Sequence, residues 1–354
     1  MNWVLVATGV ALLGLTTIDL IATVVTPGLG RGIFASRVAD VAWRVALWGH
    51  ERSPNHRLLG AIGVVLVVSV PGMWMAALWA GWTAIFSSSD QAVLVASTGV
   101  PADGWSRVYF AGYDLFTSGL GDMVPGGSVW QVLTVLDTAM GLGMVTLAVT
   151  YLVPVVQAAT GRRQLARQIA HAGCSAPELL RRCWSPPEVT WISDNAQSIT
   201  GQLQTVTEQH LTYPVLHFLH STDPYTSLGP RTAALYDAAI AARELGAGPG
   251  ERLALDLLLD AIDDLVSSVG HPSVPRGGTT PPVPDIDVRR DETVDPDPDR
   301  DGTVAGGDGR LAAAYDERAE QRRGLDALLR HDGWTWESVD GALVPGEDGR
   351  SRTT

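Results

Sequence analysis

The sequence predicts an all-α membrane protein with three transmembrane helices, a re-entrant helix and loop between the second and third, and a mainly helical cytoplasmic half. Three observations predict this. Of the 354 residues, 46% are hydrophobic and only 18% are charged, against roughly a quarter charged in ordinary soluble domains. Residues 1–160 hold eight acids and six arginines, whereas 161–354 hold thirty acids and nineteen arginines. Finally, three segments are each mostly apolar over about 20 residues or more, the length that a helix needs to cross a bilayer.

The three apolar segments are residues 3–25, 58–86 and 129–158. A helix buried in a soluble protein normally has a polar face, and the second segment contains no charge at all. The first segment lacks the basic start and the clear cleavage pattern of a signal peptide. Asp19 and Asp137 interrupt the first and third segments. Intramembrane acids are candidates for function by default, and the alternative is a hydrogen bond between helices.

Arginine in the short loops predicts the orientation, because cytoplasmic loops are enriched in basic residues. The loop 26–57 carries five arginines and the stretch after residue 160 opens with three, whereas 87–129 holds only Arg107. We therefore expect a multi-pass protein of the inner (plasma) membrane, with its N-terminus outside and its C-terminus in the cytoplasm. Apolar and charged residues alternate over 33–52, which suits an amphipathic helix on the inner leaflet or a plain connecting helix.

The external stretch between the second and third spans is expected to hold a short helix. Asp103 can cap a helix that starts near Gly104 and ends near Phe116, about 18 Å long and too short to cross a membrane. Backbone that dips into a membrane and returns is tolerated where it lines an ion or water path or is buried in protein. Gly119 and Gly121 follow, and glycine can turn successive carbonyls to one side, where they replace the hydration shell of a cation.

This stretch resembles the potassium-channel pore signature, in which Thr-x-Gly-Tyr-Gly-Asp precedes a proline. The matching residues are Thr117, Gly119, Gly121, Asp122 and Pro125. The inner helix of the family carries a hinge glycine twenty-two residues after the first filter glycine, which is the position of Gly141. The order of outer span, short helix, filter and inner span is also similar, so the resemblance covers roughly residues 58–158.

The resemblance implies a homotetrameric cation pore in which each chain supplies one loop. The implied selectivity filter comprises Thr117, Ser118, Gly119, Leu120, Gly121 and Asp122. Permeating K⁺ would meet the first four of these residues, and no other metal or cofactor is implied. Gly141 would be the gating hinge, and the lipid bilayer and further copies of the chain would be the partners.

Four positions depart from the signature. Ser118 stands where the family has valine or isoleucine, and Leu120 replaces tyrosine, as in some second pores of animal tandem-pore channels. Leu120 cannot hydrogen-bond, so a potassium-selective and a weakly selective cation channel both remain open. Asp114 and Phe116 stand where the family usually has threonines, and a buried aspartate is costly unless it is paired or protonated.

Two other classes of function are weighed against a passive channel. A non-conducting membrane sensor or scaffold could keep a pore-like fold while its tail binds partners. An enzyme is not expected, because the tail has no convincing nucleophile–base pair or metal set. The histidines His210, His217 and His220 are expected to pack or to lie at the surface rather than to bind metal. The net charge of −13 argues against nucleic-acid binding.

The expected domains begin with the first helix and its loop (1–57) and the pore module (58–158). A helical cytoplasmic domain follows over 159–270, without the glycine motif of a nucleotide-binding fold. Residues 271–309 are rich in Pro, Gly, Asp and Thr and are expected to form a disordered acidic linker. A C-terminal helical segment and tail (310–354) would dock back on the domain or bind an unknown partner.

Overall fold

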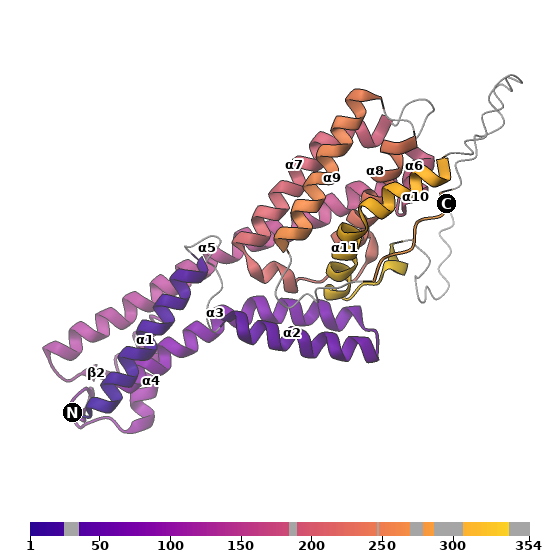
Figure 1. Ribbon diagram of the computed structural model, residues 1–354. Coiled ribbons are helices and arrows are strands. Elements are labelled where there is room, and N and C mark those ends of the chain that lie inside the picture. Colours follow the sequence, from indigo (N-terminus) through magenta and orange to yellow (C-terminus); the bar gives the residue numbers. More distant parts are fainter. Residues whose placement is uncertain (25–34, 184–189, 246–247, 270–278, 287–306, 340–354) are drawn as a thin grey trace, which may run out of the picture. The chain divides into compact units, whose positions relative to one another are not determined.

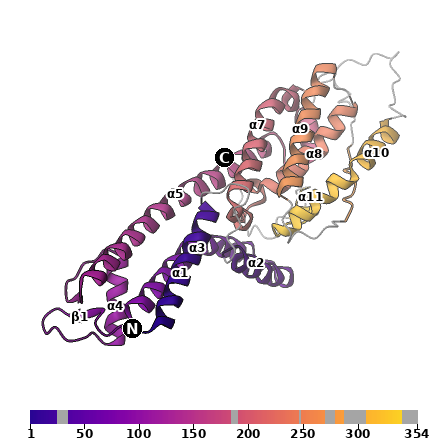
Figure 2. The same ribbon diagram turned by 60° about the vertical axis from the view of Figure 1, so that its left-hand side comes forward.

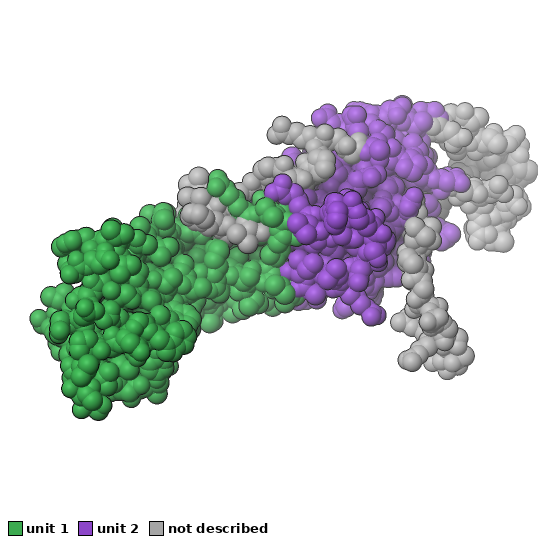
Figure 3. Space-filling model, turned by 90° about the horizontal axis from the view of Figure 1, so that it is seen from below, with its two compact units in different colours: residues 1–42, 63–157, 212–215 green, residues 43–62, 158–211, 216–354 purple. Residues whose placement is uncertain are grey.

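The computed structural model of the chain is mostly helical (Figure 1). It describes residues 1–24, 35–183, 190–245, 248–269, 279–286 and 307–339. The chain divides into two compact units, coloured separately in Figure 3. The first unit comprises residues 1–42, 63–157 and 212–215, and the second comprises 43–62, 158–211 and 216–354. Residues 43–62 and 310–339 thus belong to the second unit.

Among the residues that the structure describes, three helices are long and apolar enough to cross a membrane. They are α1 (Trp3–Val24), α3 (His56–Phe86) and α5 (Ser128–Ala172). The first two agree with the predicted segments. The third continues fourteen residues beyond the expected end at residue 158. Arginine, glutamine, leucine and alanine follow there, all strong helix formers, so the helix outlasts the apolar segment.

In the first unit α1 lies beside α3 and runs antiparallel to it, as Figures 1 and 2 show. The backbone N–H of Asn2 donates to the carbonyl of Ser88, 2.7 Å away, so the start of α1 meets the end of α3. A Cβ on Gly9 would lie 2.6 Å from the Gly81 carbonyl oxygen, so small residues let the two backbones approach, as is common between membrane helices.

Asp19 is buried between these two helices. The Trp74 indole N–H donates to Asp19 Oδ2 over 2.8 Å. Asp19 therefore forms a hydrogen bond between two helices, which is one of the two interpretations that the sequence left open.

The remaining elements of the first unit connect α3 to α5. Strand β1 (Val93–Val95) pairs antiparallel with β2 (Met123–Pro125), and α4 (Gly104–Leu115) lies between them in sequence. The Asp103 side chain caps α4 by accepting from the Ser106 N–H at 2.7 Å, as predicted. Phe110 of α4 packs edge-on against Phe86 with ring centroids 5.0 Å apart, which anchors the short helix in the core of the unit.

Helix α2 (Ala35–Arg52) has two faces, as its charge pattern predicts. On one face Trp43 is buried, and its ring lies 5.8 Å from that of Phe218 within the second unit. On the other face Val41, Val45 and Trp48 are more than half exposed. The helix therefore has a protein-packed face together with an exposed apolar stripe, so it combines features of both interpretations.

The second unit is built around α8, which Figure 2 shows beside α9. Its helices after α5 are α6 (Ala176–Cys183), α7 (Thr190–Thr212), α8 (Leu228–Leu245), α9 (Pro249–Val269), α10 (Gly307–Glu317) and α11 (Ala319–His331). Short 3-10 turns cover Pro214–Phe218, Pro224–Thr226 and Trp336–Ser338. Every residue of the alanine-rich stretch 233–242 is buried, because α6, α9, α10 and α11 all pack on α8.

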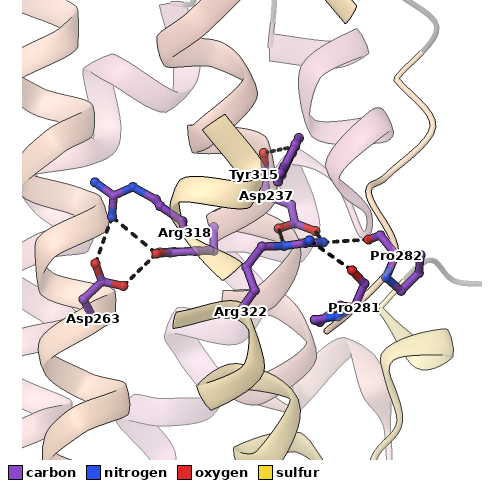
Figure 4. Close-up of polar contacts among 8 residues, drawn as sticks. Asp237, Asp263, Pro281, Pro282, Tyr315, Arg318 and Arg322 are labelled. Carbon is purple, nitrogen blue, oxygen red and sulfur yellow. Dashed lines mark hydrogen bonds and ion pairs between the residues drawn. The ribbon is translucent and has the colours of Figure 1, made fainter. Parts of the chain in front are cut away.

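The C-terminal helices α10 and α11 are part of this core, in agreement with the docking alternative. Arg322 is 1% exposed and binds both carboxylate oxygens of Asp237, at 2.9 and 3.1 Å (Figure 4). It also donates to the carbonyls of Pro281, at 3.1 Å, and Pro282, at 2.6 Å. The expectation of disorder is wrong for the described residues 279–286, because these backbone contacts hold them on α11. The rest of 271–306 and the tail after residue 339 lie outside the described residues.

Candidate functional site

The loop that follows α4 has an unusual backbone. Thr117, Gly119 and Gly121 have positive φ angles of 56°, 54° and 79°, whereas the residues between them do not. Nothing would lie within 4 Å of a Cβ on either glycine, so conformation rather than space requires glycine there. Thr117 is β-branched, and a positive φ in such a residue is rare and strained. Backbone strain of this kind concentrates at functional sites.

Hydrogen bonds fix both ends of this loop. At its start the N–H groups of Thr117 and Ser118 donate to carbonyls in the last turn of α4, at 3.0 and 2.7 Å. At its end the Ala96 N–H donates to the Asp122 carbonyl at 2.9 Å. The Tyr113 hydroxyl donates to the Met123 carbonyl at 2.6 Å, which ties α4 directly to β2. A short loop is thus held in one conformation by the elements on either side.

The loop itself is exposed in the single chain. All residues from Phe116 to Asp122 are exposed, including Leu120 at 61%. Below it the last residues of α4, from Phe110 to Leu115, are all buried. The chain therefore presents the glycine-bearing backbone on a well-packed base.

Two glycines let neighbouring helices approach α4 closely. A Cβ on Gly112 would lie 3.0 Å from the Trp79 indole, whose Nε1 donates to the Val108 carbonyl at 2.9 Å. A Cβ on Gly141 would overlap the Leu115 carbonyl oxygen at the end of α4. Gly141 therefore has a packing requirement in addition to the hinge implied by the resemblance, and α5 runs through it without interruption.

Two buried acids lie behind the loop. Asp114 of α4 is 9% exposed, and Asp137 of α5 is completely buried. Their carboxyl groups are close enough to interact electrostatically. Within the described residues neither oxygen of Asp137 has a hydrogen-bond partner. The structure thus brings together two acids that the sequence only placed separately.

The histidines singled out in the sequence lie in the second unit. The rings of His210 and His217 are 5.3 Å apart in an edge-on contact, and His210 Nδ1 lies 2.8 Å from the Val206 carbonyl. Burial, with a smaller effect of the Arg162 charge, lowers the pKa of His210 to about 3. His210 is therefore a neutral packing residue at ordinary pH. His220 lies beside His56, with His56 Nδ1 and His220 Nε2 3.0 Å apart.

Sequence reasoning missed the residues that brace the loop. Tyr113 supplies a hydrogen bond behind a loop in which Leu120 cannot. Trp79 of α3 packs on α4 where Gly112 leaves room for its ring. The sequence signal for such bracing residues is the residue type itself. The tyrosine O–H and the tryptophan N–H usually find a hydrogen-bond partner when they are buried.

Comparisons with known proteins agree with this layout. The model of the family described as "Ion channel" matches residues 63–158, which include α4, the exposed loop and most of both flanking helices. A protein of Bacillus subtilis (strain 168), described as "Uncharacterized membrane protein YdjJ", is 30% identical over 223 residues. That match covers 63% of this chain and 64% of the relative's length. No solved structure matches the chain. Residues 63–158 therefore form a domain of the ion channel family.

Proposed function

We propose that the protein is a passive, potassium-selective cation channel of the plasma membrane. Four copies of the chain would each supply the loop 117–121 to a common axis, and backbone carbonyls would replace the hydration shell of K⁺. Ions would flow down their electrochemical gradient with no covalent chemistry. The N-terminus and the loop would face outside, and the second unit would lie in the cytoplasm and regulate gating or assembly.

The observation that carries this proposal is the alternating backbone of residues 117–121 inside the ion channel domain. When left-handed residues alternate with ordinary ones, the carbonyls of successive residues can turn to the same side. A row of inward carbonyls is what a desolvated cation needs. The strained Thr117 and the exposure of the loop in the single chain support the same conclusion, because neither is favourable for a loop with no further partner.

Selectivity for K⁺ over Na⁺ is proposed to depend on how firmly the loop is held. The tyrosine of the family signature is replaced by Leu120, so its hydrogen bond behind the filter is lost. The Tyr113–Met123 hydrogen bond and the β1–β2 pairing hold the loop end instead. A weakly selective cation channel is the alternative if this bracing is insufficient.

Ion flux into proteoliposomes containing the purified full chain tests the proposal. We expect K⁺ to carry flux, and replacement of K⁺ by Na⁺ to reduce it strongly. Equal K⁺ and Na⁺ flux would indicate the weakly selective alternative. Absence of cation flux from the assembled protein, at several pH values and lipid compositions, would contradict a channel of either kind.

Gly121→Ala separates the channel from a non-conducting scaffold. Alanine at a φ of 79° is strained, so we expect the loop to rearrange. K⁺ flux should then fall at least about tenfold, which corresponds to a barrier about 1.4 kcal/mol higher. Gly127→Ala is the matched control, because Gly127 has ordinary φ and open space around a Cβ. A scaffold would show no K⁺ flux with either residue at position 121. Its cellular phenotype would be unchanged by Gly121→Ala.

A further inference from the structure

Three histidines from two distant parts of the chain meet in the second unit. His50 lies near the end of α2, His56 begins α3, and His220 lies in the connection between α7 and α8. The His56 ring stacks on Trp334, which follows α11, with centroids 4.2 Å apart. We call the residues His50, His56, His220 and Trp334 the histidine cluster. The ion channel domain, which begins at residue 63, does not contain any of them.

The histidine cluster joins the C-terminal segment to the α2–α3 hairpin. His56 and His50 meet edge-on with centroids 4.6 Å apart, and the Asn55 N–H donates to His50 Nδ1 at 2.9 Å. Trp334 also stacks on His220, at 5.5 Å. Trp334 is only 6% exposed, so these ring contacts hold the start of the C-terminal segment on the hairpin.

Gly333 makes this close contact possible. It ends α11 with a φ of 76°, and the Trp334 N–H donates back to the Leu329 carbonyl at 2.9 Å. This pattern is the Schellman ending of a helix, in which glycine is favoured. A Cβ on Gly333 would lie 2.7 Å from Leu59 Cδ1 and 3.8 Å from the His50 ring. The end of α11 therefore lies directly on the α2–α3 hairpin.

The hydrogen bond between His56 and His220 sets a limit on protonation. His56 Nδ1 lies 3.0 Å from His220 Nε2, so one of these two nitrogens must be an acceptor without a proton. A first added proton can be accommodated, because His220 Nδ1 faces Asp332 Oδ1 at 3.7 Å. A second proton would set two N–H groups against each other and place two positive charges side by side in a buried site.

The charged groups around His56 do not remove this conflict. His50 faces it from α2, His220 from the connection before α8, and Asp332 from the end of α11. Arg162 of α5 lies beyond Asp332 and interacts with the same carboxylate. One carboxylate thus serves two histidines and an arginine. Stacking of a protonated His56 on Trp334 is favourable, but it does not restore the lost hydrogen bond.

We propose that the histidine cluster is a proton-sensitive latch between the C-terminal segment 332–339 and the α2–α3 hairpin. At neutral pH the His56–His220 hydrogen bond and the Trp334 stack hold the latch closed. Burial, followed by the charges of His220 and His50, lowers the pKa of His56 to about 4. The second proton therefore enters the His56–His220 pair only near that pH, and its entry releases Trp334. Helix α3 begins at His56 and continues into the ion channel domain. Release therefore removes the contact of Trp334 with the first residue of α3.

Hydrogen exchange of the purified full chain, measured by mass spectrometry at pH 7.5 and 3.5, tests the latch. After correction for intrinsic exchange chemistry, we expect protection of amides 332–339 to fall at least about tenfold at pH 3.5, and to fall more than the protection of amides 233–242 of α8. Equal protection of 332–339 at both pH values would overturn the proposal. An equal loss in α8 would also overturn it, because the effect would then be general unfolding.

Two variants connect the response to the cluster. His56→Phe keeps a ring against Trp334 but cannot titrate, so the pH effect on 332–339 should disappear. His171→Phe, at an exposed position of α5, is the matched control and should behave like the unaltered chain. A pH response that survives His56→Phe, or that is lost in His171→Phe, would contradict the latch. Gly333→Ala should leave the segment unprotected at both pH values.

The latch does not rest on the proposed function, because its readout is backbone exchange. Cation flux measured on the same samples keeps the two apart. A pH-dependent change in exchange without any cation flux would support the latch and contradict the channel. Cation flux without a pH-dependent change in exchange would support the channel and contradict the latch.

Discussion

Gly141 shows how one residue can carry two different explanations. The resemblance to potassium channels implies a hinge at this position, whereas the structure gives the glycine a close contact with the Leu115 carbonyl. A hinge needs glycine for its backbone freedom, and a packing contact needs it for its lack of a Cβ. The two explanations predict different effects of the same substitution.

We expect Gly141→Ala to destabilise the protein by about 1–3 kcal/mol, the usual cost of overpacking. Gly143→Ala is the control, because a Cβ there has open space, and alanine favours a helix over glycine by about 0.5–1 kcal/mol. Thermal unfolding of both variants in detergent measures the difference. Unchanged stability of Gly141→Ala together with altered channel opening would favour the hinge instead.

His210 makes the second unit sensitive to acid. Burial lowers its pKa to about 3, whereas an exposed histidine titrates near 6.5. Above pH 6.5 both the folded and the unfolded chain hold His210 neutral. Between 6.5 and about 3 only the unfolded chain binds the proton, so His210 lowers the stability of the folded chain as the pH falls, by about 1.4 kcal/mol per pH unit.

The variant His210→Gln should remove this contribution while keeping a donor near the Val206 carbonyl. We expect its free energy of unfolding to fall less between pH 6.5 and 4.5 than that of the unaltered chain, by up to about 3 kcal/mol. Denaturant unfolding at the two pH values measures this. Parallel pH dependence in the two proteins would mean that His210 is protonated in the folded chain.

At the scale of elements, the buried pair of Asp237 and Arg322 joins α8 to α11. Arg322 donates four hydrogen bonds, two to the Asp237 carboxylate and two to the carbonyls of Pro281 and Pro282 (Figure 4). Nearby, Arg318 binds Asp263 of α9 at 2.8 Å. A buried pair contributes little over apolar residues of similar size, but removal of one partner is costly.

Arg322→Ala should therefore destabilise the second unit by about 3–5 kcal/mol. The matched control is Arg182→Ala, which removes an exposed ion pair with Glu178 and should cost about 1 kcal/mol or less. Urea unfolding of the full chain, followed by circular dichroism, compares the two. Equal effects of the two substitutions would show that α11 is not held by Arg322.

At the scale of the whole molecule, the proposed channel requires more than one chain, because a single loop cannot surround an ion. A homotetramer would have four times the 37.6 kDa mass of the chain. Native mass spectrometry of the protein in detergent measures this mass directly. A monomer or dimer that nevertheless conducts K⁺ would contradict the arrangement of four loops around one axis.

The sequence by itself determined the elements that depend on local patterns. Apolar length gave α1, α3 and most of α5, and Asp103 marked the start of α4. The order of Thr117, Gly119 and Gly121 identified the loop, because backbone conformation there depends on residue type at each position. These features need no knowledge of distant residues.

Only the tertiary structure decided which distant residues meet. His56 and His220 are 164 residues apart, and Arg322 reaches Asp237 across 85, so no local periodicity could pair them. Residues 279–286 have too few apolar side chains for their packing to be predicted. The buried Arg322 fixes them by binding the backbone carbonyls of Pro281 and Pro282. Side-chain hydrogen bonds between separate helices depend on how those helices pack, and packing is a property of the folded chain rather than of any segment.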